Sequence, residues 1–170
     1  MHVLLVGPDL EENLSLRYLA SSLTAAGHRA TIARFDSMDD FGRVLEQARD
    51  VDLVGLSLCY QIRAPEFTGL ARALKAERPA RPVLAGGHYA SCAAEELLTH
   101  HPELDLVVIH EGERALVELA NLPALAPGAL EAIPGLVFRD GERLRATRPR
   151  EILADLDELP WPDRTGPARL

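Results

Sequence analysis

The sequence predicts an α/β fold of the flavodoxin-like (Rossmann-like) type: a doubly wound, parallel, five-stranded sheet with helices on both faces. Three observations favour it. Short apolar runs alternate with longer amphipathic segments along the chain. The apolar runs are almost uninterrupted, as in strands buried on both faces. The connections between them are short, so successive strands are expected to run parallel, in the order 2-1-3-4-5.

The five expected strands are residues 3–6, 29–34, 53–57, 82–85 and 106–109. All are short and rich in valine, leucine or isoleucine, except residues 29–34, which alternate apolar and polar positions.

The five expected helices are residues 13–26, about 39–49, 65–77, 93–100 and 113–121. Gly27 ends the first of them, because glycine accepts the left-handed backbone of a C-cap. Ser37 or Asp39 caps the second, and Ser91 caps the fourth. Pro65 opens the third, since proline fits the first turn of a helix.

Residues 1–122 are expected to form the sheet domain, and residues 123–150 a connecting segment with a β-hairpin packed on it. The hairpin, GLVFRDGERLRA, turns at Asp140-Gly141. Residues 151–170 form an extended tail, acidic and broken by prolines, for which Trp161 is the expected anchor.

The bulk composition limits the possible partners. The net charge of −8 argues against nucleic acid. No apolar run reaches the roughly 18–20 residues of a membrane helix, and MHVLLVG is interpreted as a first strand, not a secretory signal. The two cysteines are far apart in the sequence, which is typical of reduced thiols. We therefore expect a cytoplasmic protein with no nucleic-acid or membrane partner.

Ligands of such sheets bind outside the carboxyl ends of the strands, and the usual ones are disfavoured here. A dinucleotide site needs G-x-G-x-x-G, whereas the first loop has Gly7 alone and no P-loop lysine follows. Asp9, Glu11 and Glu12 in that loop would repel the phosphate of a flavin. A receiver domain carries aspartate at the end of the third strand, and this strand ends Gly55-Leu56-Ser57.

The remaining candidate is a large, nearly neutral ligand rich in amides. Gly86-Gly87 would let a flat ligand approach the backbone, while Asn13, Ser57, Tyr60 and Gln61 offer hydrogen bonds. Cobalamin fits, because its corrin carries a ring of amides and its own phosphate balances the cobalt charge. Such a ligand needs no cluster of basic side chains.

The chain resembles the N-terminal cobalamin (B12)-binding domain of B12-dependent radical S-adenosylmethionine (SAM) proteins. The similar pieces occur in the family's order: ENLSLRYLASSL, VGLSLCYQIRAPEF, AGGHYASCAAEELL, DLVVIHEGERALVELA, GLVFRDG and LDELPWPDR.

The resemblance implies that methylcobalamin or hydroxocobalamin binds with its dimethylbenzimidazole tail extended into the domain, in support of methyl transfer. The implied cofactor contacts are Asn13, Leu14, Ser57, Leu58, Cys59, Tyr60, Gln61, Gly86, Gly87, His88, Tyr89, Glu111, Gly112 and Glu113.

Two departures from related sequences modify this expectation. Methionine-synthase-like B12 domains carry D-x-H-x-x-G, but here Glu11 replaces the cobalt-ligating histidine and Leu14 the glycine. Cobalt is therefore expected to be held within cobalamin without a histidine ligand. With only Cys59 and Cys92, the chain also lacks the C-x-x-x-C-x-x-C of a radical SAM cluster.

An iron–sulfur cluster and SAM are therefore expected only in a downstream radical SAM domain, acting in cis or in trans, and the chain is not expected to be catalytic alone. Two alternatives remain open: a free-standing, non-catalytic B12 carrier or sensor, and a flavodoxin-like interaction domain without a cofactor.

Overall fold

A computed structural model describes residues 1–9 and 12–164. Its seven-stranded sheet has the order β2-β1-β3-β4-β5-β6-β7. The strands are β1 (His2–Gly7), β2 (Arg29–Arg34), β3 (Leu53–Ser57), β4 (Val83–Gly86), β5 (Leu106–Val108), β6 (Leu136–Asp140) and β7 (Arg143–Ala146). The first five are parallel in the predicted order, which confirms the flavodoxin-like fold.

The C-terminal hairpin extends this sheet. β6 pairs antiparallel with β5, and β7 pairs antiparallel with β6 across the predicted Asp140-Gly141 turn. The hairpin thus supplies the backbone partners that β5 would otherwise lack at the sheet edge, and the five-stranded expectation described only the parallel part of the sheet.

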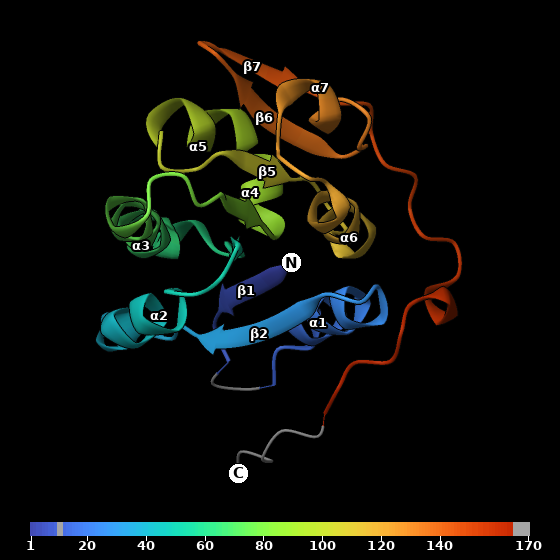
Figure 1. The fold of residues 1–170 in the computed structure, drawn as a ribbon, viewed down its shortest axis with the longest axis horizontal. Coiled ribbons are helices and arrows are strands. Elements are labelled where there is room, and N and C mark those ends of the chain that lie inside the picture. The colour runs from blue at the N-terminus through green and yellow to red at the C-terminus, as the bar shows by residue number, and fades with distance from the viewer. Residues whose placement is uncertain (10–11, 165–170) are drawn as a thin grey trace.

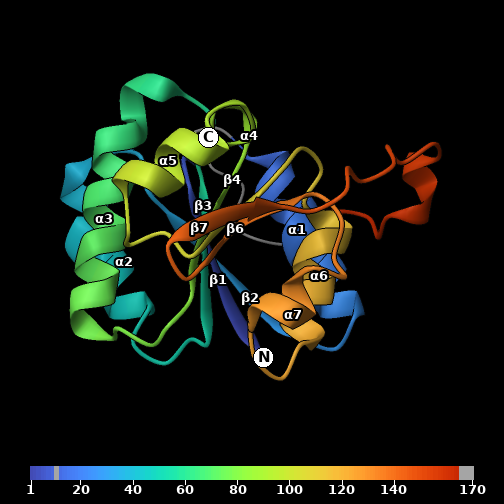
Figure 2. The same cartoon turned by 90° about the horizontal axis from the view of Figure 1, so that it is seen from above.

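The helices form two layers around the sheet (Figures 1 and 2). On one face lie α2 (Phe41–Gln47), α3 (Ala64–Glu77) and α5 (Ala94–His100). On the other lie α1 (Leu14–Ala25), α6 (Glu113–Asn121) and the short α7 (Pro127–Leu130). Each layer encloses its own apolar core, because successive side chains of a strand point to opposite faces.

Local signals set most helix starts. Asn13 is the N-cap of α1, where its side-chain oxygen accepts a hydrogen bond from the Leu16 amide at 3.2 Å. Ser37 caps a 3₁₀ turn, Met38–Asp40, that leads into α2. Pro65 occupies the first turn of α3.

The prediction that Ser91 caps the fourth helix is wrong. That segment divides into α4 (His88–Cys92) and α5, and Ser91 lies inside α4. Its hydroxyl accepts a hydrogen bond from the His110 amide at 2.9 Å instead. A serine hydroxyl serves a distant amide as well as a local one, so sequence alone could not distinguish the two roles.

The tail crosses the outside of α6 and α1 (Figure 1). Trp161 is 85% exposed, so the prediction that it anchors the tail is wrong. Polar contacts hold the tail instead. The Leu153 amide donates to Glu111 at 3.1 Å, the Asp163 amide donates to Ser21 at 3.0 Å, and Arg17 donates to the Asp163 carbonyl at 3.1 Å.

A buried arginine joins two helix ends at the edge of the sheet opposite the ligand loops. Arg81 is 1% exposed and donates to the carbonyls of Ala48, which follows α2, and of Leu74, in the last turn of α3. A cation is favourable there, because helix carbonyl groups concentrate negative charge at carboxyl ends.

We predict that Arg81→Met lowers the free energy of unfolding by about 1–3 kcal/mol, because two buried carbonyls lose a charged donor. Urea denaturation measures the loss. Arg49→Met, at an exposed position just after α2, is the matched control and should change stability little. Equal losses in both variants would contradict this role for Arg81.

Candidate cobalamin site

A furrow of small residues runs along one face of the sheet at its centre. Gly55 of β3 lies between Leu5 of β1 and Leu84 of β4 in the strand register. Two residues further along, on the same face, Ser57 pairs with Gly86. Because glycine and serine have little or no side chain, the sheet leaves space here beneath α1 and α6.

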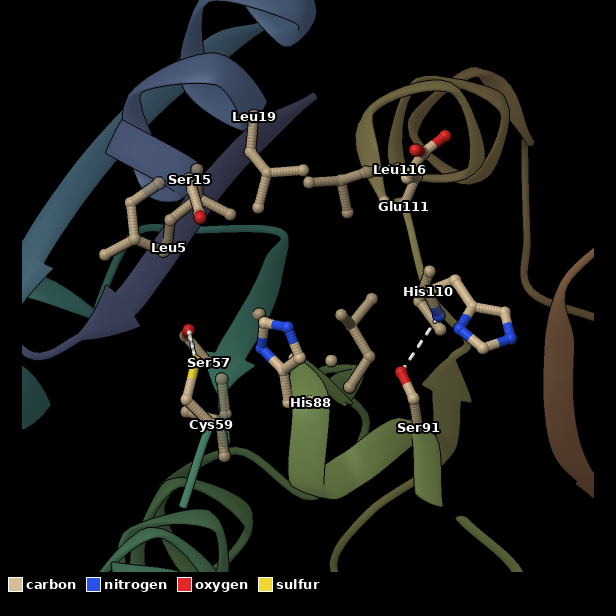
Figure 3. A pocket seen from close by; sticks show the side chains of 18 of the residues that line it. Leu5, Ser15, Leu19, Ser57, Cys59, His88, Ser91, His110, Glu111 and Leu116 are labelled. Atoms are coloured by element: carbon tan, nitrogen blue, oxygen red, sulfur yellow. Dashed lines mark hydrogen bonds between the residues drawn. The ribbon is translucent and has the colours of Figure 1, made fainter. Parts of the chain in front are cut away.

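This space is a cavity of about 420 Å³, which opens at the carboxyl ends of the parallel strands (Figure 3). Its volume is typical of pockets that hold a small molecule or part of a larger one. Leu16 and Leu19 of α1 line the cavity together with Leu116 of α6, and the side chains of Leu19 and Leu116 point toward one another (Figure 3). The location is the one at which doubly wound sheets bind ligands.

The polar lining residues gather at the mouth. Ser15 and Glu113 belong to the first turns of α1 and α6, while Ser57 ends β3. His88, at the start of α4, directs its imidazole into the cavity (Figure 3). No lysine or arginine lines this cavity among the residues that the structure describes, so an anionic ligand would find no cationic partner in its walls.

Glu113 is half-buried at the mouth. Burial raises the pKa of the Glu113 carboxyl above its usual value, and nearby Glu111 raises this pKa further, while backbone hydrogen bonds at the start of α6 oppose the rise. The ionised form of this carboxyl is therefore less favourable at the mouth than it is in water.

Gly87 has a backbone role that differs from the expected one. Its φ angle is +101°, and a Cβ atom there would lie 2.9 Å from the Leu58 carbonyl oxygen. The space beside Gly87 is thus filled by the protein itself. At Gly86 the nearest atom to an added Cβ is the Val108 carbonyl oxygen at 3.7 Å, so Gly86 is the glycine that leaves the cavity open.

Eight of the fourteen predicted contact residues line the cavity: Ser57, Cys59, Gly86, Gly87, His88, Glu111, Gly112 and Glu113. The other six do not: Asn13, Leu14, Leu58, Tyr60, Gln61 and Tyr89. As cofactor contacts, all fourteen stay predictions.

The six residues outside the cavity have other surroundings. Asn13 caps α1, Leu14 is exposed at the start of α1, and Leu58 is buried with its carbonyl oxygen against Gly87. Tyr60 is exposed in the connection between β3 and α3. Gln61 and Tyr89 line a second cavity, of about 480 Å³, near α3 and α5 on the other face.

Twelve lining residues were not predicted: Leu5, Ser15, Leu16, Leu19, Gly55, Leu56, Leu84, Ser91, Cys92, Val108, His110 and Leu116. The sequence did contain a signal for the sheet residues. Gly55 and Ser57 are two residues apart in a buried strand, so these small residues share one face of the sheet. His110 carried no comparable signal, although its φ of +61° is unusual for a residue other than glycine.

Glu11, which stands where the D-x-H-x-x-G pattern has the cobalt-ligating histidine, lies outside the described residues. Among those that are described, no group of three or more histidine, cysteine, aspartate or glutamate side chains could hold a metal ion. Nor does any described helix have the length and apolar character needed to cross a membrane.

Comparison with known proteins gives consistent results. Residues 3–120 match the family model of the B12 binding domain. The chain is 37% identical over 134 residues to the hopanoid C-3 methylase of Methylococcus capsulatus, covering 77% of this chain and 26% of that protein. It is 28% identical over 150 residues to the anaerobic magnesium-protoporphyrin IX monomethyl ester cyclase of Synechocystis, covering 85% of this chain and 30% of that protein.

Among solved structures, the chain superposes on the cobalamin-dependent SAM radical enzyme OxsB with aqua-cobalamin bound, with a TM-score of 0.71 and 19% identity. That match covers 95% of this chain and 24% of OxsB, and it shows the shared fold. The chain thus spans about a quarter to a third of the length of these relatives.

We predict that Gly87→Ala costs about 1–3 kcal/mol of folding free energy, because its backbone conformation is accessible almost only to glycine. Gly86→Ala is the matched control and should cost less, since its Cβ meets only ordinary contacts. Urea denaturation measures the free energy of unfolding of both variants. An equal loss in both would show that a side chain at Gly87 causes no particular backbone strain.

Proposed function

Because this chain belongs to the B12 binding domain family, and cobalamin is the cofactor of that family, we propose that it is the cobalamin-holding module of a B12-dependent radical SAM methyltransferase. When bound, cobalamin supplies a cobalt centre through which a methyl group is transferred. The radical SAM domain, with its iron–sulfur cluster and SAM, would belong to another part of the same protein or to a partner.

The observation that carries the proposal is the cavity above β3. It joins an apolar interior to a polar mouth, at the carboxyl edge of a parallel sheet, and no lysine or arginine of the described chain lines it. Nucleotide and flavin phosphates are poorly suited to such a site. A cofactor with neutral amides and an apolar aromatic base suits both parts of it.

The residues of the chain would then have separate tasks. Leu16, Leu19 and Leu116 would enclose the dimethylbenzimidazole tail and exclude water from it. Ser57 and His88 at the mouth would offer hydrogen bonds to the cofactor. The exposed loop at Tyr60 and Ile62 would cover the part of the cofactor that remains outside the cavity.

A free-standing B12 carrier remains the second candidate, and it shares this site. We also propose that the chain is divided into a sheet domain (residues 1–122), a connecting segment with the hairpin (123–150) and a tail (151–170). A cytoplasmic location is part of the same proposal. Cys59 and Cys92 are both free thiols, in keeping with a reducing compartment.

We predict that the protein retains about one equivalent of cobalamin after mixing with hydroxocobalamin and desalting, measured by ultraviolet–visible absorption. Gly86→Leu should lower the affinity at least tenfold, because its side chain would enter the cavity from an open position. Gly42→Leu, at an exposed site in α2 with no atom near the added Cβ, is the control. A colourless wild-type protein would overturn the proposed function.

We further predict that bound cobalamin has no histidine on cobalt. Electron paramagnetic resonance of the cobalt(II) form tests this, since a coordinated nitrogen splits each cobalt line into a triplet. Single lines are expected. His88 and His110 are the histidines that line the cavity in the described chain. Triplets lost in His88→Ala or His110→Ala would identify a ligand and contradict the prediction, whereas triplets kept in both would indicate retained dimethylbenzimidazole or another histidine.

A further inference from the structure

The cavity changes character with depth. Leu5, Gly55 and Leu84 form its floor, one step further from the strand ends than Ser57 and Gly86. Leu19 lies one helical turn beyond Ser15, and Leu116 lies nearly one turn beyond Glu113. The polar side chains of the cavity therefore lie at its mouth, beside Leu16 and Val108, whereas the side chains of the floor and of the deeper walls are aliphatic.

In the part of the chain that the structure describes, the backbone of the floor and of the deeper walls adds no free hydrogen-bonding groups. The strand residues of the floor lie within paired stretches of β1, β3 and β4, so their amides and carbonyls serve the sheet ladder. Leu19 and Leu116 lie inside α1 and α6, whose amides and carbonyls are engaged within each helix.

Ser57 is the polar side chain nearest to this floor along the sheet. It lies in the outer row of the furrow, and its hydroxyl is 3.4 Å from the sulfur of Cys59, within hydrogen-bonding distance for sulfur. A ring nitrogen or amino group placed between Leu5, Leu19 and Leu116 would therefore find no partner among the side chains that line this part of the cavity in the described chain. The buried hydroxyl of Ser22, which has no hydrogen-bond partner, lies about one turn beyond Leu19 in α1 and is not among the lining residues.

From this we propose a selectivity that rests on the proposed function: the site distinguishes cobamides by the base of their nucleotide tail and selects an apolar benzimidazole over a purine. A benzimidazole that has left cobalt presents an aromatic body with methyl groups, which the aliphatic walls accommodate. Adenine carries an exocyclic amine and additional ring nitrogens, and these would lose their water without replacement.

The selectivity should be large enough to measure but limited in size. An apolar pocket rejects a polar group of similar shape by a moderate factor, because the group loses hydration without a steric clash. We expect at least tenfold weaker binding of the adenine-containing cobamide, which corresponds to about 1.4 kcal/mol.

The experiment titrates the wild-type protein with the aquo forms of three compounds: cobalamin, the cobamide that carries adenine as its base, and cobinamide, which lacks the nucleotide tail. We expect cobalamin to bind most tightly, with both others at least tenfold weaker. Equal affinities for cobalamin and the adenine cobamide would overturn the selectivity while leaving the proposed function intact. If cobinamide bound as tightly as cobalamin, the selectivity would also be overturned, because the base would then contribute nothing to binding in the cavity. Failure of cobalamin to bind would overturn both.

Two variants at one position test the cause. Leu19→Asn places an amide in the deeper wall and should reduce the preference for cobalamin at least threefold, whereas the apolar Leu19→Met should retain it. An unchanged preference in Leu19→Asn, with cobalamin still bound, would show that the aliphatic wall is not its source and would overturn the proposed cause.

Discussion

The site depends on one steric constraint: the shortage of side-chain volume on one face of β3 and its neighbours. Gly55, Ser57 and Gly86 share that face, and none can fill the space beneath α1 and α6. Protein interiors are otherwise packed almost as densely as organic crystals. A cavity of about 420 Å³ persists here, and its floor is formed by Gly55 between Leu5 and Leu84.

The polar mouth follows from the direction of the chain. Each parallel strand ends at the same edge, and each following helix begins there, so loop residues and the first turns of helices gather above the furrow. This is why His88, which follows β4, lines one opening with Glu111 and Glu113, which follow β5. The same geometry leaves the aliphatic parts of α1 and α6 to enclose its depth.

The segments after the parallel sheet support this arrangement from outside. The hairpin completes the edge of the sheet at β5, and the tail crosses the two helices that wall the cavity. Glu111 links these layers directly, because it lines the cavity and accepts a hydrogen bond from the Leu153 amide of the tail. The tail is therefore attached to the mouth of the site through at least one shared residue.

The sequence by itself determined the fold class, the strand order and the family, because periodicity, caps and loop lengths act locally and the similar pieces keep a fixed order. It also identified the connections that follow β1, β3, β4 and β5 as the ones around the site, although in the first of these it named Asn13 and Leu14, whereas Ser15 and Leu16 line the cavity. Only the tertiary structure decided which residues form the cavity. Leu19 and Leu116 are ordinary apolar positions in their own helices, and they line the cavity because Gly55 leaves a space beneath them. Likewise, the role of Gly87 depends on the distant carbonyl of Leu58, and no local pattern reports such a contact.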